Sequence, residues 1–209
     1  ARNIGIKYAR GEIIAFTDDD CQPDSEWLEN AKKHFDKYKS AGLEGLIYTD
    51  ESKLADNRYR IVTNKGFNGI GFMTANLFIR HDILTKIGGF DERFDKPHFR
   101  EDTDLAWRAQ DYGQIPFADD VRVYHPPLLR NSKGESSDER DRFFVNDALL
   151  FSKHPQKYIN LMRAEGHYAK NKNFWRYFKE GCDQINDMSP MDEMKRQPDI
   201  CKYMQEYLR

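Results

Sequence analysis

The sequence predicts an α/β fold, in which a sheet is flanked by helices, followed by a helical C-terminal segment. Short apolar runs at 13–16, 43–48 and 76–80 have the length of buried strands. Segments with apolar residues at helical spacing lie between these runs, and such an alternation is typical of α/β proteins. From residue 143 onward the apolar residues recur at helical spacing alone.

Length and composition favour a globular protein that does not bind nucleic acid. The chain has 209 residues, a net charge of -2 and 13% aromatic residues, so neither a strongly basic surface nor disorder is indicated. No apolar run reaches the roughly 18 residues of a membrane span, and no secretory signal is seen. Three cysteines without metal-ligand spacing or a paired framework fit a reducing cytosol. We therefore expect a cytoplasmic protein.

The first half of the chain alternates helix and strand. Residues 1–10 have the pattern of the end of a helix, which Gly11 stops. The strand that follows is apolar on both faces and predicts a central, buried position in the sheet. The expected elements after this helix are strand 12–17, helix 25–38, strand 43–48 and a polar loop over 50–70.

The second half continues this alternation before it becomes polar. Glycines mark the ends of two expected helices, and Pro126 and Pro127 prevent the last strand from continuing. The expected elements are strand 76–80, helix 81–87 closed by Gly88 and Gly89, helix 101–112 ended by Gly113, and two short strands at 115–117 and 121–124.

The chain beyond residue 128 divides into a linker and a tail. Residues 130–142 are almost wholly polar and predict a mobile loop. Two apolar stripes follow at helical spacing, one beginning at Phe174 and one at Ile200; they favour core packing over docking to a membrane surface. The predicted regions are a catalytic domain at 1–128, a linker at 129–142 and a helical tail at 143–209.

Three consecutive carboxylates, Asp18 to Asp20, follow the first strand directly. They repel one another unless a positive charge lies among them, and Mg²⁺ or Mn²⁺ is bound by such groups. Ligands of open α/β sheets bind at this end of the strands. The alternative is a solvated acidic turn before the next helix.

A second acidic group lies at Glu101, Asp102 and Asp104. In the first turn of a helix, Asp102 would be kept ionised by the helix dipole and could take a proton. The alternative is an ordinary acidic first turn paired with Arg108. His125 ends the last strand, as the acids end the first, and could complete a metal site if the two strands share a sheet.

Together these motifs, in this order, resemble a family 2 glycosyltransferase with the GT-A fold. The resemblance spans about residues 1 to 128, and its specificity lies in the order and spacing of the pieces. The matching segments are Ala1-Arg2-Asn3-x-Gly5, Gly11-Glu12-Ile13-Ile14-Ala15-Phe16-Thr17-Asp18-Asp19-Asp20-Cys21-x-Pro23, Asn76-Leu77-Phe78-Ile79-Arg80, Gly88-Gly89-Phe90-Asp91-Glu92-Arg93-Phe94, Glu101-Asp102-Thr103-Asp104-Leu105-Ala106-Trp107-Arg108 and Val123-Tyr124-His125.

The resemblance implies an inverting transfer of a hexosyl group from a nucleotide-sugar to an acceptor hydroxyl, aided by Mg²⁺ or Mn²⁺. Asp102 matches the general base, and Asp20 and His125 match metal ligands. The acceptor would be a glycan, a lipid-linked or another hydroxyl compound. The remaining assignments are Asp18, Asp19 and Arg2 for the donor, and Gly89, Phe90, Asp91 and Glu101 for the acceptor side.

The resemblance also implies that the chain carries only the C-terminal part of the Rossmann-like, mixed GT-A sheet. Family members begin with two to three strand–helix units, roughly 60–90 residues, that hold the nucleobase and ribose. We therefore expect an incomplete donor site. Two alternatives remain: a non-catalytic fragment or binding module, and a metal phosphohydrolase built on the acidic triplet. The tail could cover the acceptor side, pair with a second copy or contact the inner face of a membrane.

Overall fold

The computed structural model describes residues 1–130, 141–164 and 168–208, which form two compact units. The first unit contains Ala1–Asp91 and Asp102–Ser132, and the second contains Glu92–Glu101 and Lys133–Arg209, as far as these residues are described. Most of the predicted linker, residues 131–140, lies outside the described residues. The functional boundaries at 128 and 143 stay predictions.

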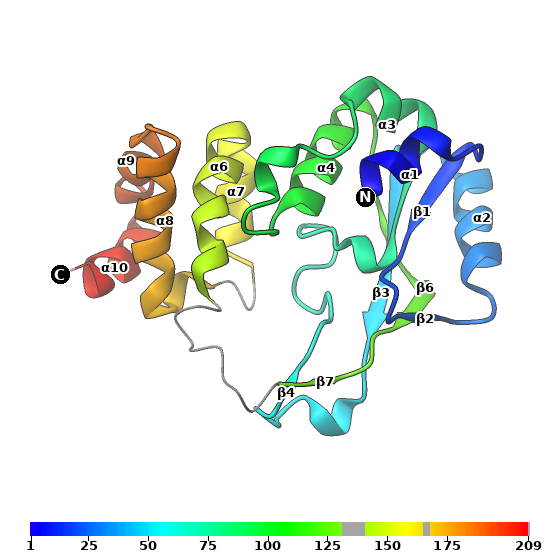
Figure 1. Ribbon diagram of the computed structural model, residues 1–209, viewed down its shortest axis with the longest axis horizontal. Coiled ribbons are helices and arrows are strands. Elements are labelled where there is room, and N and C mark those ends of the chain that lie inside the picture. Colours follow the sequence, from blue (N-terminus) through cyan, green and yellow to red (C-terminus); the bar gives the residue numbers. More distant parts are fainter. Residues whose placement is uncertain (131–140, 165–167, 209) are drawn as a thin grey trace. The chain divides into compact units, whose positions relative to one another are not determined.

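The first unit contains the sheet to which β1, β2, β3 and β6 belong (Figure 1). This mixed sheet has five strands in the order β1-β5-β3-β6-β2. β3 and β6 are parallel, whereas the other neighbouring pairs are antiparallel. β1, β3 and β6 therefore run in the same direction and end at the same edge of the sheet. The strands are β1 (Ile13–Phe16), β2 (Gln22–Pro23), β3 (Gly42–Tyr48), β5 (Leu77–Arg80) and β6 (Phe117–Tyr124).

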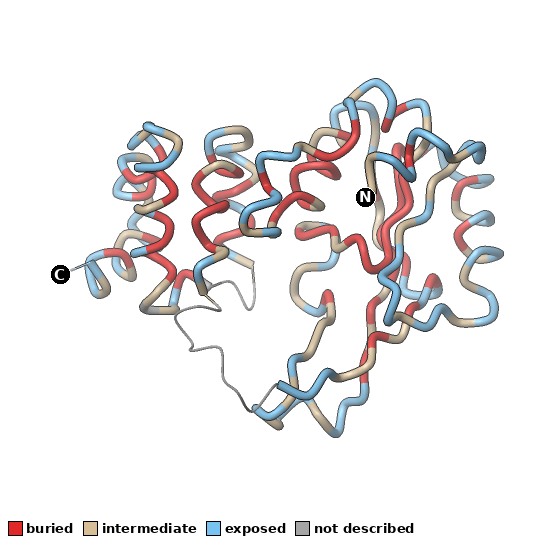
Figure 2. Tube along the Cα trace, in the orientation of Figure 1, coloured by how far each residue is buried: buried red, intermediate tan, exposed pale blue. Residues whose placement is uncertain are grey.

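Among the described residues, the four helices expected from the sequence accompany this sheet. They are α1 (Arg2–Tyr8), α2 (Trp27–Lys37), α3 (His81–Ile87) and α4 (Glu101–Ala109). α2 covers one face, where Ala31 and Phe35 pack on Leu43, Phe78 and Val121 in the buried core. Figure 2 shows buried residues along the strands of the sheet and in α2. Gly88 ends α3 in the left-handed conformation, with φ of 76°, which a glycine adopts without strain.

Residues 115–124 contain one strand, β6, rather than the two predicted. Its pairing with β3 shifts register between Gly45 and Leu46, so Asp119 and Asp120 interrupt the apolar pattern without ending the strand. Asn76 spans this irregularity, because its Nδ2 donates to Leu46 O at 2.9 Å and to Val121 O at 2.8 Å. A side chain at Gly45 would collide with Asn76, which explains the glycine there.

Among the described strands β1 pairs with β5 alone, and Ala15 is exposed. A central position for β1 in the sheet of the family stays a prediction. One further expectation was wrong. The loop expected over 50–70 contains β4 (Tyr59–Arg60), which pairs with β7 (Leu128–Leu129) in a separate two-stranded sheet. β4 and β7 are two residues long, which is too short for a periodic apolar pattern to show in the sequence.

The second unit is helical, as predicted for the tail. Its helices are α6 (Val145–Lys153), α7 (Pro155–Met162), α8 (Lys172–Gln184), α9 (Ser189–Lys195) and α10 (Pro198–Tyr207). Phe174, Trp175 and Phe178 of the first stripe are fully buried, and Ile200 and Met204 of the second are also buried. Both stripes therefore serve mainly core packing. Among the described residues, no helix is long and apolar enough to span a membrane.

The segment Glu92–Glu101 belongs to this helical unit. Asn146 Nδ2 donates to the carbonyl oxygens of Pro97 and Phe99 at 2.6 and 3.0 Å. Arg100, which has a φ of 73°, pairs with the buried carboxylate of Asp147 at 2.9 Å. Tyr158 donates to the same carboxylate at 2.7 Å. These bonds hold the stretch that directly precedes α4.

Candidate functional site

The acidic triplet forms a turn between β1 and β2. Cys21 N donates to Asp18 O at 3.2 Å, which closes the turn. β2 then pairs with the end of β6, with Gln22 opposite Tyr124. Since Asp20 and Cys21 directly precede β2 and His125 directly follows β6, this pairing brings the two strand ends together.

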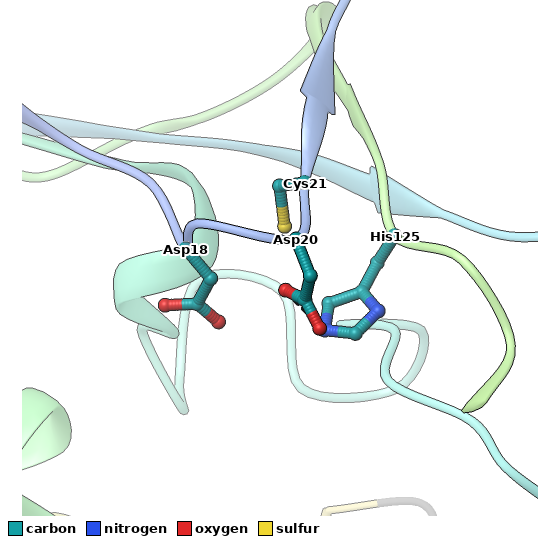
Figure 3. A group of neighbouring side chains, drawn as sticks. All are labelled: Asp18, Asp20, Cys21 and His125. Atoms are coloured by element: carbon teal, nitrogen blue, oxygen red, sulfur yellow. Dashed lines mark ion pairs between the residues drawn. The ribbon is translucent and has the colours of Figure 1, made fainter. Parts of the chain in front are cut away.

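Asp18, Asp20, Cys21 and His125 form one group at this edge (Figure 3). One ligand atom from each residue lies within 4.8 Å of the corresponding atoms of the others. His125 Nε2 is 3.7 Å from Asp20 Oδ1, while its Nδ1 is 3.0 Å from Pro126 O. If Nδ1 donates to that carbonyl, Nε2 presents its lone pair to the carboxylates, which is the arrangement of a metal-binding imidazole.

The charges of this group suit a hard divalent cation. Burial raises the pKa of Asp18, and the neighbouring Asp20 and Asp19 raise it further, against the lowering effects of His125 and Arg2. Burial also raises the pKa of Cys21, so its thiol is protonated at neutral pH and the oxygens and imidazole are the better ligands. A cation would relieve the repulsion between the carboxylates.

Asp19 and Arg2 lie beside this group rather than in it. Asp19 is exposed. The Arg2 guanidinium lies 4.3 Å from the centre of the Phe90 ring, and its Nη1 donates to Thr74 Oγ1 at 2.8 Å. Arg2 lowers the pKa of Asp18, so the guanidinium acts electrostatically on the turn.

Asp102 is the second residue of α4 and is half-buried. Thr103 N donates to its Oδ1 at 2.7 Å, and Thr74 N approaches its Oδ2 at 3.4 Å. Two backbone donors thus favour the ionised carboxylate. Because Thr74 also binds Arg2, one residue connects the predicted base with the side chain that acts on the acidic turn.

The predicted acceptor-side residues have varied positions. Gly89 and Phe90 are buried; Asn3 Oδ1 accepts from Phe90 N at 2.8 Å, and Asn3 Nδ2 donates to Phe90 O at 3.0 Å. Asp91 is half-buried. Glu101 is buried within the second unit, and its Oε1 lies 2.8 Å from His98 Nε2. Contact of these residues with an acceptor stays a prediction.

Asp104, the third acid of the second acidic group, forms an ion pair with Arg108. The Arg108 guanidinium lies 2.8 Å from Asp104 Oδ2 and donates to the carbonyl oxygens of Ile87 and Gly89. The alternative predicted for this part of the sequence, an acid paired with Arg108, therefore holds for Asp104. Asp102 makes different contacts.

Sequence reasoning missed Glu44 and Cys21. Glu44 lies on β3, is fully buried and accepts hydrogen bonds from Gly69 N and Asn64 Nδ2. The available signal was a lone acid inside an otherwise apolar strand, since glutamate is rarely buried without partners. Cys21 joins the group at the sheet edge only through the β2–β6 pairing, which leaves no pattern in the sequence.

Comparison with known proteins gives a consistent result. The family model described as Glycosyl transferase family 2 matches residues 1–98. Glycosyltransferase AglE of Haloferax volcanii is 33% identical over 137 residues, which cover 60% of this chain and 43% of that protein. The chain thus spans less than half the length of this relative.

Two solved structures share the fold at low sequence identity. Mannosyltransferase PcManGT from Pyrobaculum calidifontis, in complex with GDP-Man and Mn²⁺, aligns with a TM-score of 0.53 and 17% identity over 99% of this chain and 62% of its own. S. aureus TarS in complex with UDP-GlcNAc aligns with a TM-score of 0.50 and 16% identity over 99% of this chain and 59% of its own.

Proposed function

We infer from these matches that the chain belongs to family 2 of the glycosyltransferases, and its structure has the GT-A fold. From this premise we propose that it transfers a hexosyl group from a nucleotide-sugar to an acceptor hydroxyl with inversion. The observation that supports this most is the layout of the first unit. Two carboxylates and an imidazole meet at the end of β1 and β6, and Asp102 lies apart from them, connected through Thr74 and Arg2.

Asp20 and His125, with Asp18, would hold Mg²⁺ or Mn²⁺. When bound, the cation would stabilise the negative charge on the departing nucleoside diphosphate. PcManGT was solved with GDP-Man and Mn²⁺, and TarS with UDP-GlcNAc, which supports a nucleotide-sugar as the donor here. Arg2 would add a positive charge on the donor side.

Asp102 would act as the general base. Its carboxylate would accept the proton of the acceptor hydroxyl as that oxygen forms a bond to the anomeric carbon. The carbon–oxygen bond to the diphosphate breaks on the opposite side, so the configuration at the anomeric carbon inverts. The bonds from Thr74 N and Thr103 N hold the carboxylate in one orientation for this step.

A donor panel tests the proposal. The chain is incubated with Mn²⁺, UDP- and GDP-sugars and glycan or lipid-linked acceptors, and the anomeric configuration of any product is read by NMR. Transfer with inversion is the expected result for the protein with a complete donor site. Nucleotide binding without turnover would favour a binding module. Phosphate release from simple esters, without sugar transfer, would favour a metal phosphohydrolase.

A further inference from the structure

The fully buried carboxylate of Glu44 connects the centre of the sheet with a loop over residues 64–74. Its Oε2 accepts from Gly69 N, and its Oε1 accepts from Asn64 Nδ2 at 3.3 Å. The backbone N–H of Met73 lowers the pKa of this carboxylate. Asn64 is fixed in turn, because its Oδ1 accepts from Ile47 N at 3.0 Å. Glu44 thus fastens this loop to β3 through Asn64 and Gly69.

The other side of the same loop is fastened to α4. Thr103 Oγ1 donates to Gly71 O at 2.7 Å, and Trp107 Nε1 donates to Ile70 O at 3.1 Å. The loop ends at Thr74, whose N–H faces Asp102 Oδ2. Hydrogen bonds at both sides of the loop, together with the loop backbone itself, therefore link Glu44 to the carboxylate of Asp102.

We propose that Glu44 is a positioning residue for Asp102: its carboxylate holds the 64–74 loop so that Thr74 N orients the Asp102 carboxylate. The proposal rests on the proposed function in so far as Asp102 is the base. The contacts from Glu44 to Asp102 all lie in the first unit and involve neither the acidic turn nor His125.

A change in the protonation state of Glu44 should then change the hydrogen bonding of the Asp102 carboxylate. Burial raises the pKa of Glu44 to about 7, and the negative charge of Asp102 contributes to this rise. The hydrogen-bond donors that face Glu44 from the loop are uncharged, and its sheet neighbours Leu77 on β5 and Phe117 on β6 are apolar. Protonation near neutral pH removes the charge and one acceptor position, which loosens the bond from Gly69 N to Glu44.

NMR of the whole chain tests this without reference to turnover. In wild type, the amides of Gly69 and Thr74 and the carboxyl carbon of Asp102 should share an inflection near pH 7. Glu44→Gln should abolish that inflection at all three sites. The same change at the exposed Glu51 serves as the control and should leave it in place.

Kinetics then tests the consequence for catalysis. In Glu44→Gln we expect kcat to fall by roughly 10–100-fold, while the donor KM changes by less than about twofold, as a misplaced catalytic group predicts. In the NMR titration, an inflection at Gly69 without one at Thr74 and Asp102 would overturn the proposal. The absence of an inflection at all three sites would also overturn it. Because the shared inflection is measured in the wild-type protein, this part of the test does not require Glu44→Gln to fold. Absence of transfer by wild type would count against the proposed function only.

Discussion

At the scale of single residues, the carboxylates of the first unit occupy three environments that suit different tasks. Asp18 and Asp20 lie on an exposed turn within reach of His125, where a cation can bind them. Asp102 is half-buried and accepts hydrogen bonds from two backbone N–H groups. Glu44 is fully buried, and its pKa is raised to about 7. The surroundings, not the residue type, separate these roles.

Asp102→Asn removes the proton affinity of the predicted base and keeps its shape. We expect turnover to fall by roughly 10²–10⁴-fold, the usual contribution of a positioned base, with donor binding nearly unchanged. Steady-state kinetics beside Asp119→Asn, an exposed acid on β6, would check this. A near-normal rate would exclude Asp102 as the base.

The raised pKa of Glu44 also leads to a prediction of how the free energy of unfolding depends on pH. Its pKa is 4.5 in the unfolded chain and about 7 in the folded protein, so between these values the folded state binds more protons. The free energy of unfolding should therefore fall as pH rises from 4.5 to 7, by about 3 kcal/mol from this group. Denaturant titrations of wild type and Glu44→Gln would measure it as the difference between the two pH profiles. Parallel profiles would contradict a buried, titrating Glu44.

At the scale of elements, the sequence predicted what local patterns encode. Apolar runs and glycine stops identified β1, β3, β5, α2 and α3 because each is determined within a few residues. β6 was divided in two, because its bulge depends on Asn76, which is distant in the sequence. The place of β1 in the sheet depends on the order of the strands, and the hydrogen bonds to the buried Glu44 come from donors 20 to 25 residues away in the sequence; neither is a local property.

The packing of α8 on α6 gives a testable result for the second unit. An ideal Cβ at Gly181 would overlap Val145 O and lie 2.9 Å from Ala148 Cβ. Gly181→Ala should destabilise this unit by about 1–3 kcal/mol, because the helices must separate. Gly5→Ala in α1 is the matched control, since a Cβ there meets nothing within 4 Å, and it should be neutral or slightly stabilising. Thermal unfolding distinguishes them; equal effects would mean that α6 and α8 are not closely packed.

At the scale of the whole molecule, the chain passes from the first unit into the second after Asp91 and returns after Glu101, the first residue of α4. The segment Glu92–Glu101 is held in the second unit by the buried Arg100–Asp147 pair and by Asn146. Asp102 follows it directly and belongs to the first unit. One covalent connection between the two units therefore lies next to the predicted base.

The account depends most on the claim that the ends of β1 and β6 form one metal centre. Binding of Mn²⁺ to the whole chain, followed by electron paramagnetic resonance, tests it directly. Wild type should bind Mn²⁺ and show coupling to an imidazole nitrogen. Asp20→Asn should weaken binding by at least about tenfold, His125→Asn should remove the nitrogen coupling, and Asp19→Asn, outside the group, should change neither. Equal Mn²⁺ affinity in wild type and Asp20→Asn, or nitrogen coupling that survives in His125→Asn, would contradict the claim.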